Sequence, residues 1–225
     1  MRDHQPEAQW RALWERIKAQ GDASPPYHDL TRRLAEPHRA YHTLRHILHC
    51  LDEMGRVRPL AAYPDAMEMA LWYHDAIYDT HAPDNEAQSA ALAAQILRDA
   101  SVPEPFVQKV VRLIMVTKDH TVAEDLDTRL LVDIDLAILG QPAPVFDAYE
   151  HHIRQEYAWV PPAAFVEGRT RILRSFLPRA TIYATAHFRQ HYEGHARSNM
   201  ARSLRVLEQP GLMAHTTDHC VARGC

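Results

Sequence analysis

The order of hydrophobic and polar residues predicts helices along nearly the whole of this chain. Apolar residues recur three and four positions apart, the spacing at which side chains share one face of a helix. The first such stretch covers residues 5–20 and ends before Gly21. Its Trp10, Leu13 and Ile17 lie on one face. No stretch shows the sustained alternation of apolar and polar residues that a half-buried strand requires. The pattern therefore predicts an all-α protein.

Proline and glycine residues divide the rest of the chain into further predicted helices. A second helix begins after Pro25 and Pro26 and ends before Pro37. The later helices are predicted at residues 43–57, 64–74, 85–100, 104–118 and 125–139, then twice between Pro142 and Pro178, and last at 185–207.

Three regions follow from these helices. We interpret residues 1–36 as N-terminal helices packed on the core and residues 37–208 as one helical core domain. Residues 209–225 have no apolar period, and we expect them to form a disordered tail.

Composition and charge exclude several classes of protein. The chain has 225 residues, with 25 Lys and Arg against 29 Asp and Glu, a formal net charge of −4. This balance argues against an extended nucleic-acid surface, which is usually basic. No apolar run reaches the roughly 20 residues of a membrane span, and the N-terminus lacks the apolar centre of a signal peptide. We therefore expect a cytoplasmic protein with no membrane partner.

The counts of three residue types guide the search for a functional site. The three cysteines, Cys50, Cys220 and Cys225, are too few and too scattered for a disulfide framework. Only 7 glycines are present, which leaves little for a glycine-rich phosphate loop. Histidine occurs 16 times, and it is the commonest metal-ligand side chain. A histidine cluster is therefore the first feature to look for.

A His-Asp pair ends the helix predicted at 64–74. His74 continues the apolar face of Met67 and Leu71, so it should point into the protein. Burying an ionised Asp75 beside it is costly unless the charge is paired or bound to a metal. The pair is compatible with a metal site and with an ordinary helix-end cap.

Two aspartates occur in the segment at 130–140, and the helical period separates them. At about 100° per residue, Leu131, Ile134 and Ile138 form one face, and Asp135 lies within it. A carboxylate on a core-facing side needs a cation, either Lys or Arg or a metal. Asp133 falls on roughly the opposite face, and we interpret it as a solvated acid or as one that supports the ligands from behind.

Three histidines crowd the start of the helix predicted at 43–57. His46 lies at the edge of its apolar face near Cys50, whereas His49 points further outward and His42 precedes the helix. The pattern alone leaves a ligand role and a surface role for His46 equally open.

Taken in this order, these features resemble the HD superfamily of metal-dependent phosphohydrolases, and most closely its small predicted phosphohydrolases. The resemblance covers residues 37–183. The motifs that carry it are Tyr41-His42 with His46-Ile47, WYHDAIYD at 72–79, DNEAQSA at 84–90, TKDH at 117–120, DIDLAILG at 133–140, RQEY at 154–157, and Gly168-Arg169. The resemblance implies a single helical bundle domain of the HD type.

The resemblance also implies a metal site and an activity. The implied ligands are His46, His74, Asp75 and Asp135, a donor set that suits one divalent ion (Mn, Fe, Co, Ni or Zn, and less well Mg). Such an ion lowers the pKa of a bound water, so that hydroxide is available near neutral pH. The expected reaction is cleavage of a phosphate ester or anhydride in a nucleotide or another small phosphorylated metabolite.

Further roles follow from the same motifs. The expected catalytic groups are Glu86, Lys118 and His120. The expected substrate-binding groups are His42, Arg154 and Arg169. Simpler roles stay open for several of them: Glu86 could stabilise the start of its helix, Lys118 and His120 the end of theirs, and Arg154 could form a surface pair with Glu156.

Two other functions remain open on this scaffold. A di-iron oxygenase would need two more histidines between the His-Asp pair and Asp135, and the chain offers His81 and His120. A non-catalytic module that senses a metal or a ligand would keep the ligands without turnover. Alarmone hydrolysis is disfavoured, because Tyr78 stands where the motif of those enzymes has a glutamate. A homo-oligomer is compatible with all of these.

Overall fold

The computed structural model describes residues 6–118 and 125–209. Within these ranges every regular element is a helix, which confirms the all-α prediction. The elements are α1 (Pro6–Arg16), α2 (Ser24–Arg33), α3 (Leu44–Val57), η1 (Arg58–Leu60), α4 (Pro64–Tyr73), α5 (Asn85–Asp99), α6 (Glu104–Met115), α7 (Leu126–Asp135), η2 (Leu136–Gly140), α8 (Ala143–Glu156), α9 (Pro162–Phe176) and α10 (Ala186–Leu207). The predicted tail lies outside the described residues from position 210 onward. None of the described helices combines the length and the hydrophobicity that crossing a membrane would take.

The largest departure from the predicted helices is at 125–139. There the α-helix ends at Asp135 and the chain continues as the 3-10 helix η2, whose residues are all buried. A 3-10 turn is tighter than an α-helical turn and changes the direction of the side chains. Asp135 therefore lies at the point where one helix type changes to the other.

Helix α4 is the centre of the N-terminal group of helices. It packs against α1, α3, α5, α6 and α7, and all of its residues from Ala66 to Tyr73 are buried. A helix that is covered on every side is largely apolar all round rather than on one face, and the one acid in this stretch of α4, Glu68, is paired with Arg16 and Arg58. Its C-terminal end is where His74 and Asp75 follow.

Helices α1 and α2 cover one side of α4. Trp10 is fully buried, and its ring meets Trp72 edge-on at a centroid distance of 5.6 Å. Its indole N–H donates to the carbonyl oxygen of Ala23 at 2.8 Å. Because this buried donor is satisfied, the large ring adds apolar contact without leaving an unpaired polar group.

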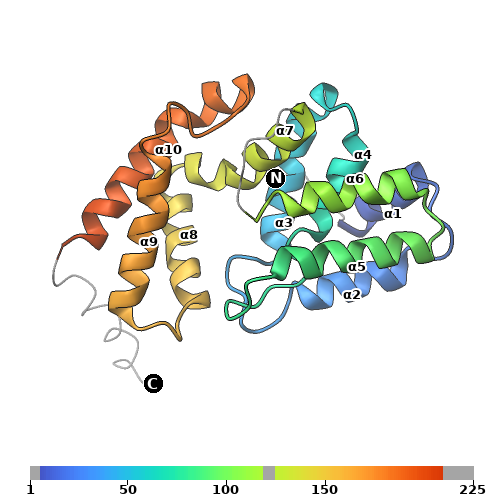
Figure 1. The fold of residues 1–225 in the computed structure, drawn as a ribbon, viewed down its shortest axis with the longest axis horizontal. Coiled ribbons are helices and arrows are strands. Elements are labelled where there is room, and N and C mark those ends of the chain that lie inside the picture. Colours follow the sequence, from blue (N-terminus) through green and yellow to red (C-terminus); the bar gives the residue numbers. More distant parts are fainter. Residues whose placement is uncertain (1–5, 119–124, 210–225) are drawn as a thin grey trace, which may run out of the picture.

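Helices α8, α9 and α10 form a second group beside the first (Figure 1). The 3-10 helix η2 connects the two groups, since it follows α7 and packs against both α8 and α10. One continuous hydrophobic cluster runs from Trp10 to Leu204. The chain is therefore a single all-α domain.

Gly140, at the end of η2, meets α10 too closely to accept a side chain. A Cβ there would lie 2.5 Å from the Cβ and 2.8 Å from the carbonyl oxygen of Tyr192. We expect Gly140→Ala to lower the free energy of unfolding, measured by chemical denaturation, by about 1–3 kcal/mol. The added methyl group would force the backbones of η2 and α10 apart. Gly55→Ala in α3 is the matched control, since nothing lies within 4 Å of its Cβ position. This variant should raise the free energy of unfolding by roughly 0.5–1 kcal/mol, because alanine favours a helix over glycine. Equal responses of the two variants would contradict the close contact.

Candidate metal centre

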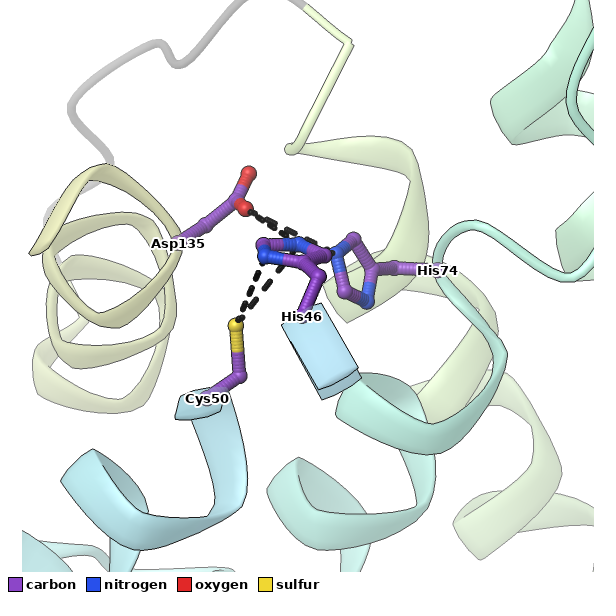
Figure 2. A group of neighbouring side chains, drawn as sticks. All are labelled: His46, Cys50, His74 and Asp135. Atoms are coloured by element: carbon purple, nitrogen blue, oxygen red, sulfur yellow. Dashed lines mark hydrogen bonds and ion pairs between the residues drawn. The ribbon is translucent and has the colours of Figure 1, made fainter. Parts of the chain in front are cut away.

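Four side chains of metal-ligand type converge where α3, α4 and α7 meet. His46 and Cys50 lie one turn apart on α3, His74 directly follows α4, and Asp135 is the last residue of α7. Their ligand atoms all lie within 4.8 Å of one another (Figure 2). This buried cluster could hold a metal ion.

The separations between the ligand atoms fit one shared ion. The Nε2 atoms of His46 and His74 are 3.0 Å apart. Oδ1 of Asp135 lies 3.3 Å from His46 Nε2 and 3.5 Å from His74 Nε2, and Oδ2 of Asp75 lies 3.4 Å and 3.1 Å from the same atoms. Two ligand atoms that are each about 2.1 Å from one ion are about 3.0 Å apart at a right angle and about 3.4 Å apart at a tetrahedral angle. The five measured separations therefore match those between atoms that bind a single ion.

The backbone of α4 fixes the ring of His74. Its Nδ1 donates to the carbonyl oxygen of Leu71 at 2.9 Å. With a proton held on Nδ1, Nε2 is the nitrogen that faces the cluster and that a metal would deprotonate and bind. Without a metal, burial is outweighed by the carboxylates of Asp75 and Asp135, which raise the pKa of His74 well above its ordinary value.

The histidine side of the cluster is closed and the carboxylate side is open. The side chains of His46 and His74 are 1% exposed, whereas those of Asp75 and Asp135 are 16% and 15% exposed. An ion held between them would therefore have protein on one side and access for a small molecule on the other. An open position is what distinguishes a catalytic metal site from a structural one.

The charge state of Asp75 suits a ligand. Burial alone would raise the pKa of this carboxyl group. The charges of His74 and His42 and hydrogen bonds from His46 and His74 outweigh it and hold the pKa of Asp75 well below its ordinary value. The carboxylate is thus ionised, as a metal ligand must be.

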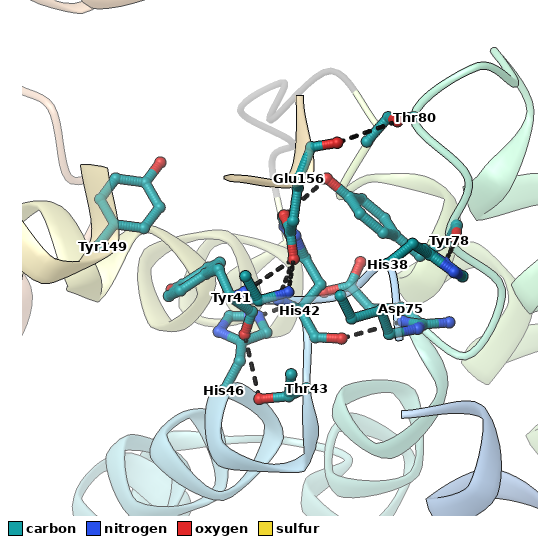
Figure 3. Close-up of polar contacts among 12 residues, drawn as sticks. His38, Tyr41, His42, Thr43, His46, Asp75, Tyr78, Thr80, Tyr149 and Glu156 are labelled. Atoms are coloured by element: carbon teal, nitrogen blue, oxygen red, sulfur yellow. Dashed lines mark hydrogen bonds and ion pairs between the residues drawn. The ribbon is translucent and has the colours of Figure 1, made fainter. Parts of the chain in front are cut away.

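Glu156, the last residue of α8, holds the chain that leads into α3 (Figure 3). Its Oε1 accepts hydrogen bonds from three successive backbone N–H groups, those of Ala40, Tyr41 and His42, at 2.8–2.9 Å. Its Oε2 pairs with Nδ1 of His42 at 2.7 Å and accepts from the hydroxyl of Tyr78 at 3.1 Å. This carboxylate therefore fixes the turn that places His46 in the first turn of α3.

Arg39 ties the same turn to the end of α4. Its side chain is fully buried, and Nη1 donates to the carbonyl oxygens of His42 at 3.0 Å and of Asp75 at 2.7 Å. Nη2 donates to the carbonyl oxygen of Ala76 at 3.0 Å. One guanidinium thus joins the segment before His46 to the segment that contains Asp75, which sets the spacing of ligands from two helices.

The contacts of Glu156 predict an acid-dependent loss of stability. Burial opposes ionisation, but the hydrogen bonds and charge of His42 and the bonds from Ala40 lower the pKa of Glu156 from 4.5 to about 2. A lowered pKa stabilises the folded state fully above pH about 4.5, and this contribution is lost as the pH falls toward about 2. In urea unfolding of the metal-free protein, the stability difference between wild type and Glu156→Gln should shrink across this range. A difference that stays constant with pH would contradict the assignment.

The structure corrects the interpretation of Asp133 that was made from the sequence. We interpreted it as a solvated or supporting acid, but it is 1% exposed and accepts hydrogen bonds from the N–H groups of Ala184 and Thr185 at 2.8 and 2.7 Å. The Thr185 hydroxyl donates to it as well, at 2.6 Å. The chain that enters α10 covers this face of α7, so Asp133 is enclosed there, and of the two residues only Asp135 joins the cluster.

The residues predicted to act in catalysis or substrate binding lie in different parts of the structure. His42 stacks on the ring of Tyr78 at a centroid distance of 4.1 Å, beside the cluster. Glu86 is half-buried in the first turn of α5, and Lys118 is exposed just after α6. His120 lies outside the described residues.

Both arginines predicted to bind phosphate form hydrogen bonds to other groups of the protein. Arg154 donates to the carbonyl oxygens of Tyr157 at 2.6 Å and Val160 at 3.2 Å, which closes the end of α8. Arg169 is buried and donates to Glu150 at 3.1 Å and to the hydroxyl of Tyr149 at 2.9 Å. Arg154 therefore does not form the surface pair with Glu156 that the sequence left open.

The oxygenase alternative needs histidines at a second metal, and His81 lies elsewhere. Its ring is exposed, stacks on Trp159 at a centroid distance of 4.1 Å, and pairs with Asp79 at 2.9 Å. The other histidine of that alternative, His120, is outside the described residues. In the described part of the chain, no second group of ligands forms beside the first.

Three residues of the site were not identified from the sequence. The helical period placed Cys50 near His46, four positions earlier, but the pattern offered no reason to include it in the site. Glu156 lies within the RQEY motif but carried no distinguishing signal. Nothing in the sequence marks Arg39, because its pair with Glu36 is an ordinary local one and its other partners are carbonyl oxygens.

Comparisons with protein-family models, with curated proteins and with solved structures found no match to this chain.

Proposed function

We propose that this protein is a metal-dependent phosphohydrolase of the HD type. In this proposal, His46, His74, Asp75 and Asp135 hold one divalent ion. The observation that carries it is the set of five ligand-to-ligand separations of 3.0–3.5 Å among these four side chains. Two imidazoles and two carboxylates suit Mn, Fe, Co, Ni or Zn, in keeping with the resemblance in sequence.

Cys50 is excluded from the proposed ligand set by its position beside the ring of His46. Its sulfur is 3.7 Å from Nε2 and 3.8 Å from Nδ1. A sulfur bound to an ion on Nε2 would lie clearly nearer to Nε2, because the ion is on that side of the ring. Asp75, whose Oδ2 approaches both Nε2 atoms, is the better fourth ligand.

When bound, the ion would supply a hydroxide near neutral pH and neutralise charge on the phosphoryl group. The two carboxylates balance the two charges of the ion, so the substrate's remaining phosphate charge needs other cations. Among the expected phosphate-binding groups in the described part of the chain (His42, Lys118, Arg154 and Arg169), both arginines are bound to carbonyl, hydroxyl or carboxylate oxygens. We therefore assign phosphate binding to His42, whose ring Glu156 and Tyr78 hold in place, and to Lys118.

The test combines metal content with phosphate release. The purified protein is analysed for bound metal, reloaded with each candidate ion, and assayed for phosphate release from a panel of nucleotides, sugar phosphates and aryl phosphates. We expect about one ion per chain and release that disappears in His74→Ala. One bound ion with no release from any ester or anhydride would overturn the proposal, and two irons per chain would favour the oxygenase.

A further inference from the structure

A cavity of about 540 Å³ opens between the start of α3 and the face of α8. Its volume lies within the roughly 300–1,000 Å³ that is typical of small-molecule sites. The metal centre and the turn held by Glu156 account for only one of its walls. The rest of it has no role in the function proposed above.

The cavity adjoins the metal centre at His46. The ring of Tyr41 packs on the ring of His46 at a centroid distance of 4.8 Å and meets Tyr149 edge-on at 4.6 Å, and all three line the cavity. Figure 3 shows Tyr41 and Tyr149 beside His46, on the side away from Tyr78. The cavity therefore borders the metal centre through the rings of His46 and Tyr41.

The walls of the cavity are suited to a flat, mainly apolar group. Its lining includes the two tyrosine rings, Val145 and Ala148, and it contains no acidic side chain. Polar groups in the lining come from Thr43, Arg45, His49, Gln141 and His152. Aromatic rings pack well on the tyrosine rings and apolar side chains of such walls.

Two residues that line the cavity, Tyr41 and His49, each have a buried side-chain polar atom with no hydrogen-bond partner among the described residues. The hydroxyl of Tyr41 is buried and makes no hydrogen bond to any residue that the structure describes. Buried hydroxyl groups are nearly always hydrogen-bonded, to protein or to another molecule. A ring that bears a heteroatom or a hydroxyl group would satisfy it.

We propose that this cavity binds the organic group of the substrate and that this group is an aromatic ring system. The substrate class is then a monophosphate ester with a planar, largely apolar group, either an aryl alcohol or the base of a nucleoside. The inference rests on the proposed function for the position of the phosphate, but the cavity can be tested by binding alone.

The experiment compares two non-hydrolysable probes on the metal-loaded protein by calorimetry. We expect 1-naphthylphosphonate to bind about tenfold or more tightly than methylphosphonate, because only the naphthyl ring can bury apolar surface in the cavity. Ala148→Trp fills the cavity from α8 and should remove this preference. Ala143→Trp, also exposed on α8 but outside the cavity, should retain it.

The outcomes separate the cavity from the chemistry. Equal binding of the two probes to the wild type, or a preference that survives Ala148→Trp, would overturn the inference even if phosphate esters are hydrolysed. A preference lost only in Ala148→Trp would support it even if no ester is hydrolysed, a result that counts against the proposed function alone. A nucleoside 5′-phosphonate that binds more tightly than the naphthyl probe would identify a base as the ring, and the reverse order an aryl alcohol.

Discussion

Asp135→Ala should remove the metal from the protein while leaving the helices in place. Its carboxylate lies 3.3 Å and 3.5 Å from the two facing Nε2 atoms and is partly exposed, so its loss removes a ligand without opening the core. If a binding free energy of roughly 10–16 kcal/mol is shared among four ligands, one ligand contributes roughly 3 kcal/mol, about a hundredfold in affinity. Metal content after dialysis, measured by mass spectrometry, should fall from about one ion per chain to nearly none, and turnover should fall with it.

Two control variants make this result specific. Asp133→Asn, two residues earlier on α7, should keep its metal but unfold more easily, because Asp133 accepts hydrogen bonds from the chain that enters α10. Cys50→Ala should keep its metal as well, since its sulfur lies beside the ring of His46. Metal retained in Asp135→Ala, or lost in Cys50→Ala, would show that the ligand set is wrong.

Arg39→Met should lower the free energy of unfolding by roughly 3–5 kcal/mol, because it leaves buried polar groups without their cation. The carbonyl oxygens of His42, Asp75 and Ala76 would each lose a donor. Since these carbonyls belong to the two segments that carry the proposed metal ligands, metal affinity should fall too. Urea unfolding of the metal-free protein measures the first effect, and metal titration of the folded protein measures the second.

Arg32→Ala is the matched control for Arg39. Its guanidinium pairs with Asp29 at the surface, where both side chains are well exposed, and exposed pairs contribute only about 0–1 kcal/mol. Arg39→Lys should lie between the two variants, because one ammonium cannot reach three carbonyl oxygens in the planar arrangement of a guanidinium. If Arg39→Met behaves like Arg32→Ala, the buried guanidinium does not hold the two segments together.

The helices could be predicted because their signal is local. Apolar spacing and the positions of proline and glycine placed helices close to where they occur in the structure, as at 64–74 for α4 and 185–207 for α10. The change at Asp135 from α-helix to 3-10 helix was not predictable, because η2 is shaped by its packing against α8 and α10. Periodicity also could not show that α4 is covered on every side, which depends on five other helices.

The candidate site was predictable only in part. The inward direction of His74 and the special position of Asp135 followed from the helical period, and both residues lie in the cluster. The assignment of Asp133 as a solvated acid was wrong, because a segment some 50 residues later in the chain covers that face of α7. The role of Glu156 was hidden for the same reason, since its partners are backbone groups more than 100 residues earlier.

The sequence by itself determined that this protein is helical and which residue types were available to hold a metal, because helical period and ligand chemistry are properties of single segments. Only the tertiary structure decided which of these residues meet. The spacing of His46 relative to His74 and Asp75 depends on the contacts of Arg39 and Glu156, and these contacts join segments that are distant in the chain. Hydrogen bonds to backbone groups leave no pattern in the sequence, so the geometry of the centre becomes visible only when the helices are packed together.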